Sequence, residues 1–244
     1  MTNDETDDQI RDILHDIPER LKIAEEGVDF SLQQEYLEFT QNLDFDKYSE
    51  EDISARSQSL PSKNTPHEDK KEILAILAHR GTVESYRTIE RFLKTGEQEL
   101  EGWSTLALQE CRMFLENSLL DRSDGMLMTG LGGENNRPRY FLIIRSRSDA
   151  AFTSAQKATV ERVFSSICDR FDSILEEIQF HLNYATMKVL IPLDVAVGEV
   201  IEKGIGESNK FGGFLDPYYF VTNVKIPKET EILEYLREIK RDIE

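Results

Sequence analysis

The chain has 244 residues, which is enough for one large domain or two small ones. Of these, 39% are apolar and 31% are charged, and 47 acidic against 29 basic residues leave a formal net charge of −18. A wholly disordered chain is excluded, because enough apolar residues remain to bury a core. The acidic balance argues against a general nucleic-acid-binding protein, because phosphate neutralisation needs surplus Lys and Arg. We therefore expect no nucleic-acid partner.

The compartment is predicted from the two cysteines and the N-terminal residues. Cys111 and Cys168 are too few for a disulfide framework, and neither lies in a Cys-x-x-Cys pair. The first residues, MTNDETDDQIRD, are acidic where a secretory signal is basic and then apolar. No apolar run approaches the roughly 18 residues that a membrane-spanning helix needs. The sequence thus predicts a cytoplasmic protein with reduced thiols and no membrane partner.

Residues 1–66 form the acidic part of the chain, with 17 acidic and 6 basic residues. Helical spacing of three and four predicts an amphipathic helix, whose apolar positions are Ile10, Ile13, Leu14, Ile17, Leu21 and Ala24. A second helix is predicted over residues 32–39 and a short third one after Ser49. The polar stretch SARSQSLPSKNTP at 54–66 has no apolar periodicity. We interpret residues 1–66 as an acidic helical segment that ends in a linker.

Residues 67–122 carry three successive apolar stripes at helical spacing. The first ends at Gly81, Thr82 caps the second, and the third runs from about Glu97 to Leu120. Short turns between helices of this length are typical of antiparallel helical hairpins. We therefore predict a helical-hairpin region.

The segment of about residues 78–120 contains a sequence pattern that is found in a known family of helical repeats. A Gly-Thr turn opens a helix that ends in Phe-Leu, and the next helix reads W-x-x-L-A-L-x-E-x-x-x-x-L. This stretch resembles a HEAT-type repeat and its preceding helix. The resemblance implies stacked helical hairpins that bind partner proteins. A small helical bundle accounts for the same pattern.

From residue 123 the pattern becomes mixed. Strands are predicted at 126–131, 139–145, 185–193 and 218–226, with the first two flanking the hairpin sequence GGENNRP. Helices are predicted at 154–181 and 229–241, and a short helix or turn is predicted at 195–203. The order β-β-α-β-α-β-α predicts a domain over 123–244 in which helices pack on a four-stranded sheet. The chain is thus predicted to be α+β, with an all-helical N-terminal part.

Residues that commonly carry catalysis form no recognisable constellation. The four histidines, His15, His67, His79 and His181, have no carboxylate or Cys at metal-ligand spacing, which predicts no metal site. Both cysteines fall on apolar helical stripes and are interpreted as core residues. Carboxylate runs such as Glu176–Glu177 are interpreted as solvated surface. We assign no catalytic residue and expect no cofactor.

Two features offer an anion-binding site. Arg137, Arg139, Arg145 and Arg147 lie within one short segment, where they pair either with internal carboxylates or with an anionic ligand. The stretch KGIGESNKFGG at 203–213 is either a loop that holds an anion or closes as a flap, or the end of a helix. Arg145, Arg147 and Lys210 are the candidate anion-binding residues.

Two functions follow from these patterns. The first is a non-enzymatic adaptor that binds another protein through its helical hairpins. The second is a sensor or enzyme for an anionic, phosphorylated small molecule bound by the C-terminal domain. Internal pairing of the arginines favours the adaptor.

Overall fold

The computed structural model of the protein describes residues 21–243, with side chains described as far as residue 237. It divides after Gly130 into two compact units, which we call the N-terminal unit and the C-terminal unit. Most of the helix predicted from Ile10 onwards lies outside the described residues. Its predicted continuation through Leu21 is wrong, because β1 (Leu21–Ile23) is a strand that pairs in parallel with β2 (Gly125–Leu127). Pairing with a distant segment overrides the local helical spacing.

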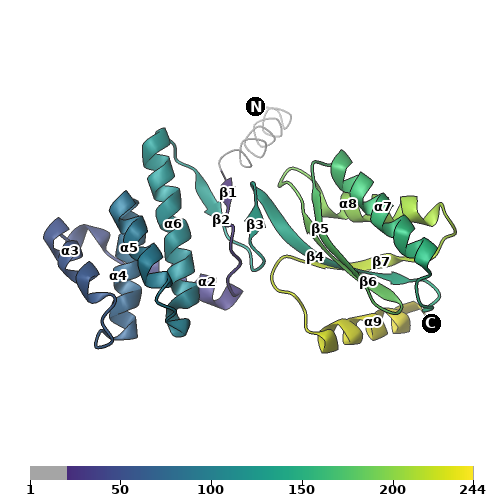
Figure 1. The fold of residues 1–244 in the computed structure, drawn as a ribbon, viewed down its shortest axis with the longest axis horizontal. Coiled ribbons are helices and arrows are strands. Elements are labelled where there is room, and N and C mark those ends of the chain that lie inside the picture. The colour runs from purple at the N-terminus through teal and green to yellow at the C-terminus, as the bar shows by residue number, and fades with distance from the viewer. Residues whose placement is uncertain (1–20, 244) are drawn as a thin grey trace, which may run out of the picture. The chain divides into compact units, whose positions relative to one another are not determined.

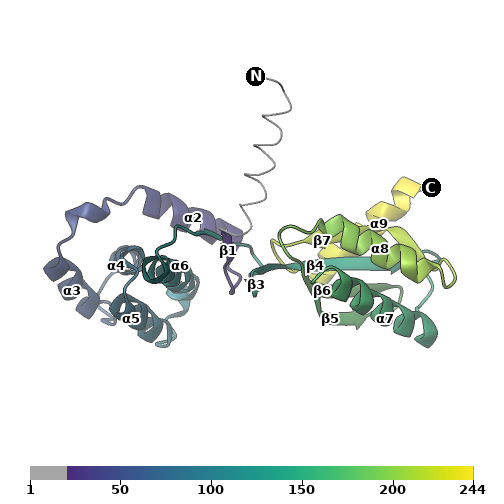
Figure 2. The same cartoon turned by 90° about the horizontal axis from the view of Figure 1, so that it is seen from above.

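Within the described residues 21–130, the N-terminal unit is helical apart from that short strand pair. Its helices are α2 (Phe30–Gln41), α3 (Glu50–Ser59), α4 (His67–Arg80), α5 (Val83–Leu93) and α6 (Glu101–Leu120), with the single turns η1 (Phe45–Lys47) and η2 (Gln98–Leu100). Figures 1 and 2 show α4, α5 and α6 side by side. Between α4 and α5 the chain turns at Gly81, whose φ of +54° favours glycine and whose Cβ position would overlap Phe114. The resemblance to a HEAT repeat stays a prediction.

The predicted linker at 54–66 is wrong. Helix α3 continues to Ser59, and Ser49 caps its start with a reciprocal hydrogen-bonded pair to Asp52. Ile53 and Leu60 are buried in the same core as Trp103. Their spacing of seven residues, two helical turns, places both on one face although the residues between them are polar. Residues 50–66 are therefore part of the packed N-terminal unit.

The C-terminal unit confirms the predicted α+β class. Its elements are β3 (Gly133–Glu134), β4 (Arg137–Ser146), α7 (Ser154–Arg170), β5 (Ile174–Phe180), β6 (Tyr184–Leu190), α8 (Val197–Asn209), β7 (Leu215–Thr222) and α9 (Glu229–Ile243). The four long strands are antiparallel in the order β7–β4–β6–β5, and β3 pairs with the start of β4. This β-α-β-β-α-β order is the ferredoxin-like arrangement.

Helices cover both faces of this sheet. Figure 1 shows α7 and α8 on one face and α9 on the other, which we call the α9 face. Alternating residues of β4 supply the two cores: Leu142 and Ile144 pack towards α7 and α8, and Phe141 and Ile143 pack towards α9. The α9 face therefore has its own small core, which includes Ile232.

Two predicted segments of this unit differ from the structure. The long helix at 154–181 ends at Arg170, and residues 174–180 form β5, because their backbone pairs along β6. The glycine-rich stretch 203–213 is helix α8 as far as Asn209, so a long loop or flap is absent from these described residues. Gly204 belongs in that helix because α8 packs against Phe164 of α7 at this position. Only residues 210–214 connect α8 to β7.

Candidate functional site

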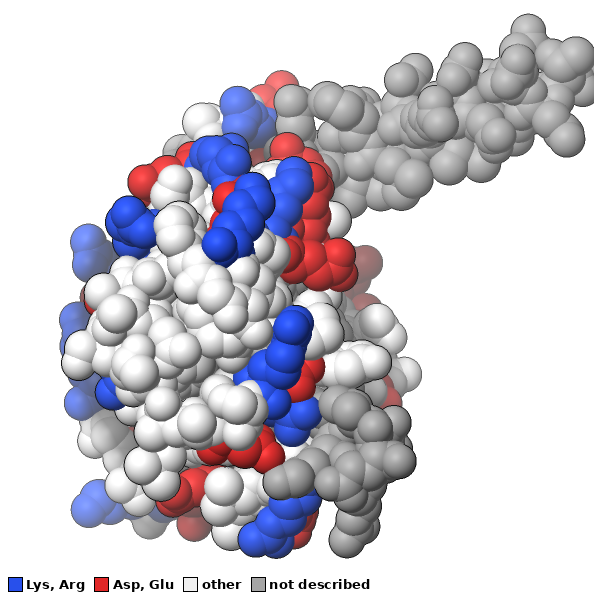
Figure 3. Space-filling view, turned by 90° about the vertical axis from the view of Figure 1, so that its right-hand side faces the viewer, with Lys and Arg blue, Asp and Glu red and all other residues white. Residues whose placement is uncertain are grey.

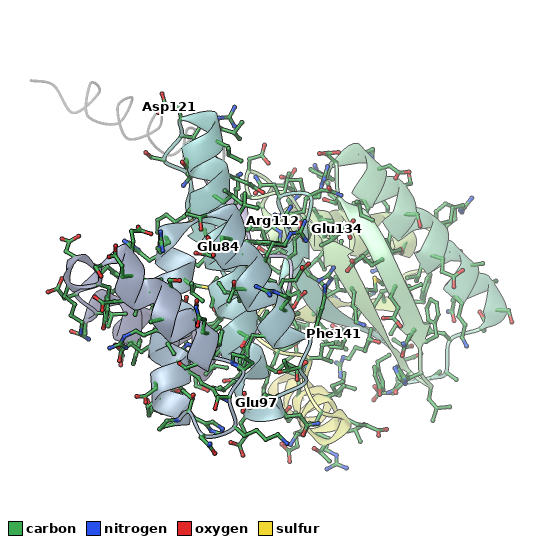
Figure 4. The ribbon with its side chains drawn as sticks, turned by 60° about the vertical axis from the view of Figure 1, so that its left-hand side comes forward. Glu84, Glu97, Arg112, Asp121, Glu134 and Phe141 are labelled. Atoms are coloured by element: carbon green, nitrogen blue, oxygen red, sulfur yellow. The ribbon has the colours of Figure 1, made fainter. Side chains whose placement is uncertain are left out.

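A cavity opens on the α9 face of the sheet beside the start of α9. Its volume is about 330 Å³. Phe141, Tyr184 and Ile232, each buried, supply apolar walls, and Ile226 adds an exposed one. Figure 4 labels Phe141, which lies between the sheet and α9. Such an apolar recess with a few polar groups is the usual form of a small-molecule site.

The polar side of the cavity comes from neighbouring positions on β5 and β6. The cross-strand pair Glu177 and Lys188 is joined by an ion pair of 2.8 Å. The ammonium of Lys188, followed by an amide hydrogen bond from Gln179, lowers the pKa of Glu177. Gln179 and Thr186 form the next cross-strand pair along the same face. These residues line one wall with donors and acceptors.

An aromatic wall closes the cavity at the turn between β5 and β6. The rings of His181 and Tyr184 are stacked, with centroids 4.3 Å apart and planes 11° from parallel. Burial, followed by the nearby carboxylate of Glu229, raises the pKa of Tyr184. Tyr184 is therefore a neutral ring at neutral pH, and Glu229 contributes an exposed carboxylate to the rim. The cavity thus combines flat aromatic surface with hydrogen-bonding groups.

The predicted anion-binding residues do not line this cavity. Arg145 is buried and donates two hydrogen bonds to Asp216 Oδ2, at 2.8 and 2.6 Å. Lys210 pairs with Glu207 at 2.8 Å, and Arg147 lies exposed beyond the end of β4. The three residues therefore belong to separate arrangements, and Arg145 already has a carboxylate partner. Anion binding at Arg147 and Lys210 stays a prediction.

The other arginines of the predicted basic strand are also paired within the unit. Arg139 donates to both carboxylate oxygens of Glu176, at 2.6 and 2.7 Å. Arg137 pairs with the carboxylate and the backbone carbonyl of Asp172. A bidentate pair of this kind satisfies the guanidinium without a ligand.

Metal ligands and reactive thiols do not cluster in the part of the chain that the structure describes. Residues 21–243 contain no group of three His, Cys, Asp or Glu side chains placed to hold a metal ion. Burial raises the pKa of Cys111 to about 12 and of Cys168 to about 11, so both are protonated core thiols. In the same residues no helix is both long and apolar enough to cross a membrane.

Sequence reasoning missed most of the cavity. The sequence predicts no site at His181, and it places Glu177 in a helix because residues 154–181 have helical spacing. The alternation of polar and apolar residues in 174–180 is the signal that would have placed Glu177 and Gln179 on one strand face.

Comparison with known proteins gives few matches. No family model and no curated protein sequence matches the chain. A crystal structure of a putative transposase from Deinococcus radiodurans R1 matches 42% of this chain and 90% of its own, at 14% identity and a TM-score of 0.37. A REP-associated tyrosine transposase bound to a REP hairpin matches 43% of this chain and 69% of its own, at 8% identity and a TM-score of 0.33.

These matches correct two predictions. Both solved structures are transposases, which contradicts the predicted function as a helical-repeat adaptor and the exclusion of nucleic acid. At these TM-scores they assign no activity to this chain. The exclusion of nucleic acid rested on whole-chain charge, which is unevenly divided. Residues 1–130 hold 29 acidic and 14 basic residues, whereas residues 131–244 hold 18 and 15, a net charge of only −3.

Proposed function

We propose that the C-terminal unit binds a nucleobase of single-stranded nucleic acid in the cavity on the α9 face. The observation that carries this proposal is the combination of the stacked His181 and Tyr184 rings with the polar wall of Glu177, Gln179 and Lys188. Single-stranded bases are recognised on β-sheets by stacking on aromatic side chains and by hydrogen bonds to their edges. The proposal rests on this geometry alone.

The dimensions of the cavity support a single ring system. A volume of about 330 Å³ is at the lower end of the roughly 300–1,000 Å³ of small-molecule sites. The cavity is partly open to solvent, so the rest of a strand can remain outside it. A base that enters meets apolar surface from Phe141 and Ile232 and the imidazole ring of His181.

The rim favours bases that carry amino groups. The carboxylate of Glu229 and the amide oxygen of Gln179 accept hydrogen bonds, and carboxylates pair with exocyclic amines such as cytosine N4. Lys228 is exposed next to Glu229 in the chain and offers a cation to the phosphate of a bound nucleotide. With a net charge of −3, residues 131–244 oppose a phosphate chain far less than the whole chain does.

Binding is tested by the fluorescence anisotropy of labelled decanucleotides of mixed sequence added to the full chain. We expect His181→Ala to raise Kd at least about fivefold, because base stacking on an aromatic ring contributes about 1–3 kcal/mol. Tyr218→Ala is the matched control, since Tyr218 is an exposed aromatic residue of β7 outside the cavity. No binding by the unaltered protein, or equal effects of both changes, overturns the proposal.

The compartment that we propose is the cytoplasm. Cys111 and Cys168 are free thiols in two different cores, and reduced thiols are typical of that compartment.

A further inference from the structure

Three connections of the C-terminal unit meet at one end of its sheet, which we call the loop end. They are residues 147–153 after β4, residues 181–183 between β5 and β6, and residues 210–214 after α8. Backbone hydrogen bonds hold them together: Arg147 N–H donates to Phe214 O at 2.9 Å, and Phe152 N–H donates to Leu182 O at 3.0 Å. The loop end is therefore one surface built from three loops.

Large apolar side chains are exposed on this surface. Leu182 is 79% exposed and Phe211 is 61% exposed. Beneath them, Phe152 contacts the rings of Phe180 and Phe214 at centroid distances of 5.8 and 6.3 Å, which supports the loops from inside. Figure 3 looks onto this end of the molecule and shows uncharged surface across its centre. Large apolar side chains exposed together at one end of a unit are typical of a contact surface.

Basic side chains surround the apolar surface. Lys157 lies 5.6 Å from the centroid of the Phe180 ring, and Arg162 lies 5.4 Å from that of Phe211. Arg147 and Lys210 come from the loops themselves, whose one acidic residue is Asp149, and Glu207 of α8 lies beside Lys210. Glu207 is paired with Lys210, and Asp149 accepts a hydrogen bond from Asn183. In a chain with a net charge of −18, this local excess of cations fits an anionic partner.

We propose that the loop end docks peripherally on a lipid bilayer that contains anionic headgroups. Leu182 and Phe211 enter the headgroup region, while Arg147 and Lys210 contact the anionic lipids. A bilayer accounts for both the exposed apolar side chains and the cations, because a soluble polyanion would leave the aliphatic side chain of Leu182 in water. Contact of this kind needs no spanning helix. One of the three loops also supplies His181 to the proposed base-binding cavity, but Leu182 and Phe211 do not line that cavity, and neither do Arg147 and Lys210. Variants at these four residues therefore test the loop end without removing a cavity wall.

Vesicle flotation of the full chain tests the proposal, with vesicles of phosphatidylcholine alone or with about one third phosphatidylserine. We expect binding only to the vesicles that contain phosphatidylserine. Leu182→Ser with Phe211→Ser is expected to weaken it at least about tenfold, because both changes remove the groups that enter the bilayer. Arg147→Gln with Lys210→Gln is expected to weaken it and to reduce its dependence on salt, because Lys157 and Arg162 remain charged.

Ile174→Ser with Tyr218→Ser is the matched control, since both residues are exposed apolar positions away from the three loops. This pair is expected to leave vesicle binding unchanged. The proposal is overturned if the unaltered protein does not float with anionic vesicles, or if the control pair weakens binding as much as the pair at the loop end. Binding of soluble heparin without vesicle binding assigns the cations to a soluble polyanion and also overturns it. Melting curves of each variant establish that its fold is intact.

Discussion

Arg145 and Asp216 form the most deeply buried ion pair on the α9 face among the described residues. Both side chains are less than a tenth exposed, and Asp216 also accepts the backbone N–H of Tyr218 at 3.0 Å. Removing the cation leaves a buried carboxylate without its partner, which costs more than the intact pair contributes. Arg145→Met is therefore expected to lower the free energy of unfolding by about 3–5 kcal/mol, measured by urea denaturation.

Arg147 gives the control for that measurement. It is exposed, so Arg147→Met is expected to change the stability by less than about 0.5 kcal/mol. Equal losses from the two variants would mean that Asp216 is satisfied without Arg145. A higher stability of the Arg145 variant would show that the desolvation of the ion pair costs more free energy than the attraction between its charges contributes.

Glu110 in the N-terminal unit couples stability to pH. Its carboxylate accepts a hydrogen bond from the buried Tyr36, whose ring packs edge-on against Trp103 with centroids 5.0 Å apart. Burial raises the pKa of Glu110 in spite of that hydrogen bond. The folded state therefore holds the proton more tightly than the unfolded state does. The stability that results is present at low pH and is lost as the pH rises through the folded pKa.

Glu110→Gln removes this dependence because an amide does not titrate in this range. The free energy of unfolding of the variant minus that of the unaltered protein is expected to be larger at pH 7 than at pH 4. Urea denaturation of both proteins at the two pH values measures this difference. The window begins near the ordinary Glu pKa of about 4.3 and extends upwards. An unchanged difference across the window would show that Glu110 ionises as freely in the fold as in the unfolded chain.

Helix α8 shows how one element depends on glycine at one position and tolerates it at another. A Cβ at Gly204 would lie 2.6 Å from Cζ of the buried Phe164, whereas a Cβ at Gly206 would meet no atom within 4 Å. Gly204→Ala is expected to cost about 1–3 kcal/mol through overpacking. Gly206→Ala is expected to raise the free energy of unfolding by about 0.5–1 kcal/mol, because glycine has a low helix propensity. Thermal unfolding compares the two, and a loss at both positions would contradict the packing argument.

Elements in which the apolar residues recur with one clear period were predictable from the sequence. Helices α4, α5 and α6 follow apolar stripes separated by Gly81 and Gly96, and both glycines have positive φ angles. Strand β5 was not predictable in the same way, because Phe171, Ile174 and Leu175 continue the stripe of α7 at helical spacing. Asp172 ends the helix with a φ of +49°, and the pairing with β6 then decides the strand. The cavity was missed for this reason, since one of its walls is β5.

At the scale of the whole molecule, the two units have separate cores. One cluster of buried residues lies wholly within 28–128, and the other two lie wholly within 131–244. The charge follows the same division, with most of the net −18 in residues 1–130. Composition averaged over the chain therefore hid a nearly neutral C-terminal unit, and only the structure shows where the division falls. We expect the fragment 131–244 to fold alone, with one cooperative melting transition.

That division gives a prediction for binding. The acidic N-terminal unit repels a phosphate chain over the Debye length, which is about 30 Å at 0.01 M salt and about 8 Å at 0.15 M. The fragment 131–244 is therefore expected to bind a single-stranded decanucleotide more tightly than the full chain at 0.01 M salt, with the difference shrinking at 0.15 M. Anisotropy titrations of both proteins measure this. An uncharged nucleoside is the control, and it is expected to bind both proteins equally at either salt concentration, because repulsion needs charge on both partners. Equal affinities for the decanucleotide at 0.01 M would show that the acidic unit does not act on ligands of the C-terminal unit, whereas failure of both ligands to bind would count against the cavity itself.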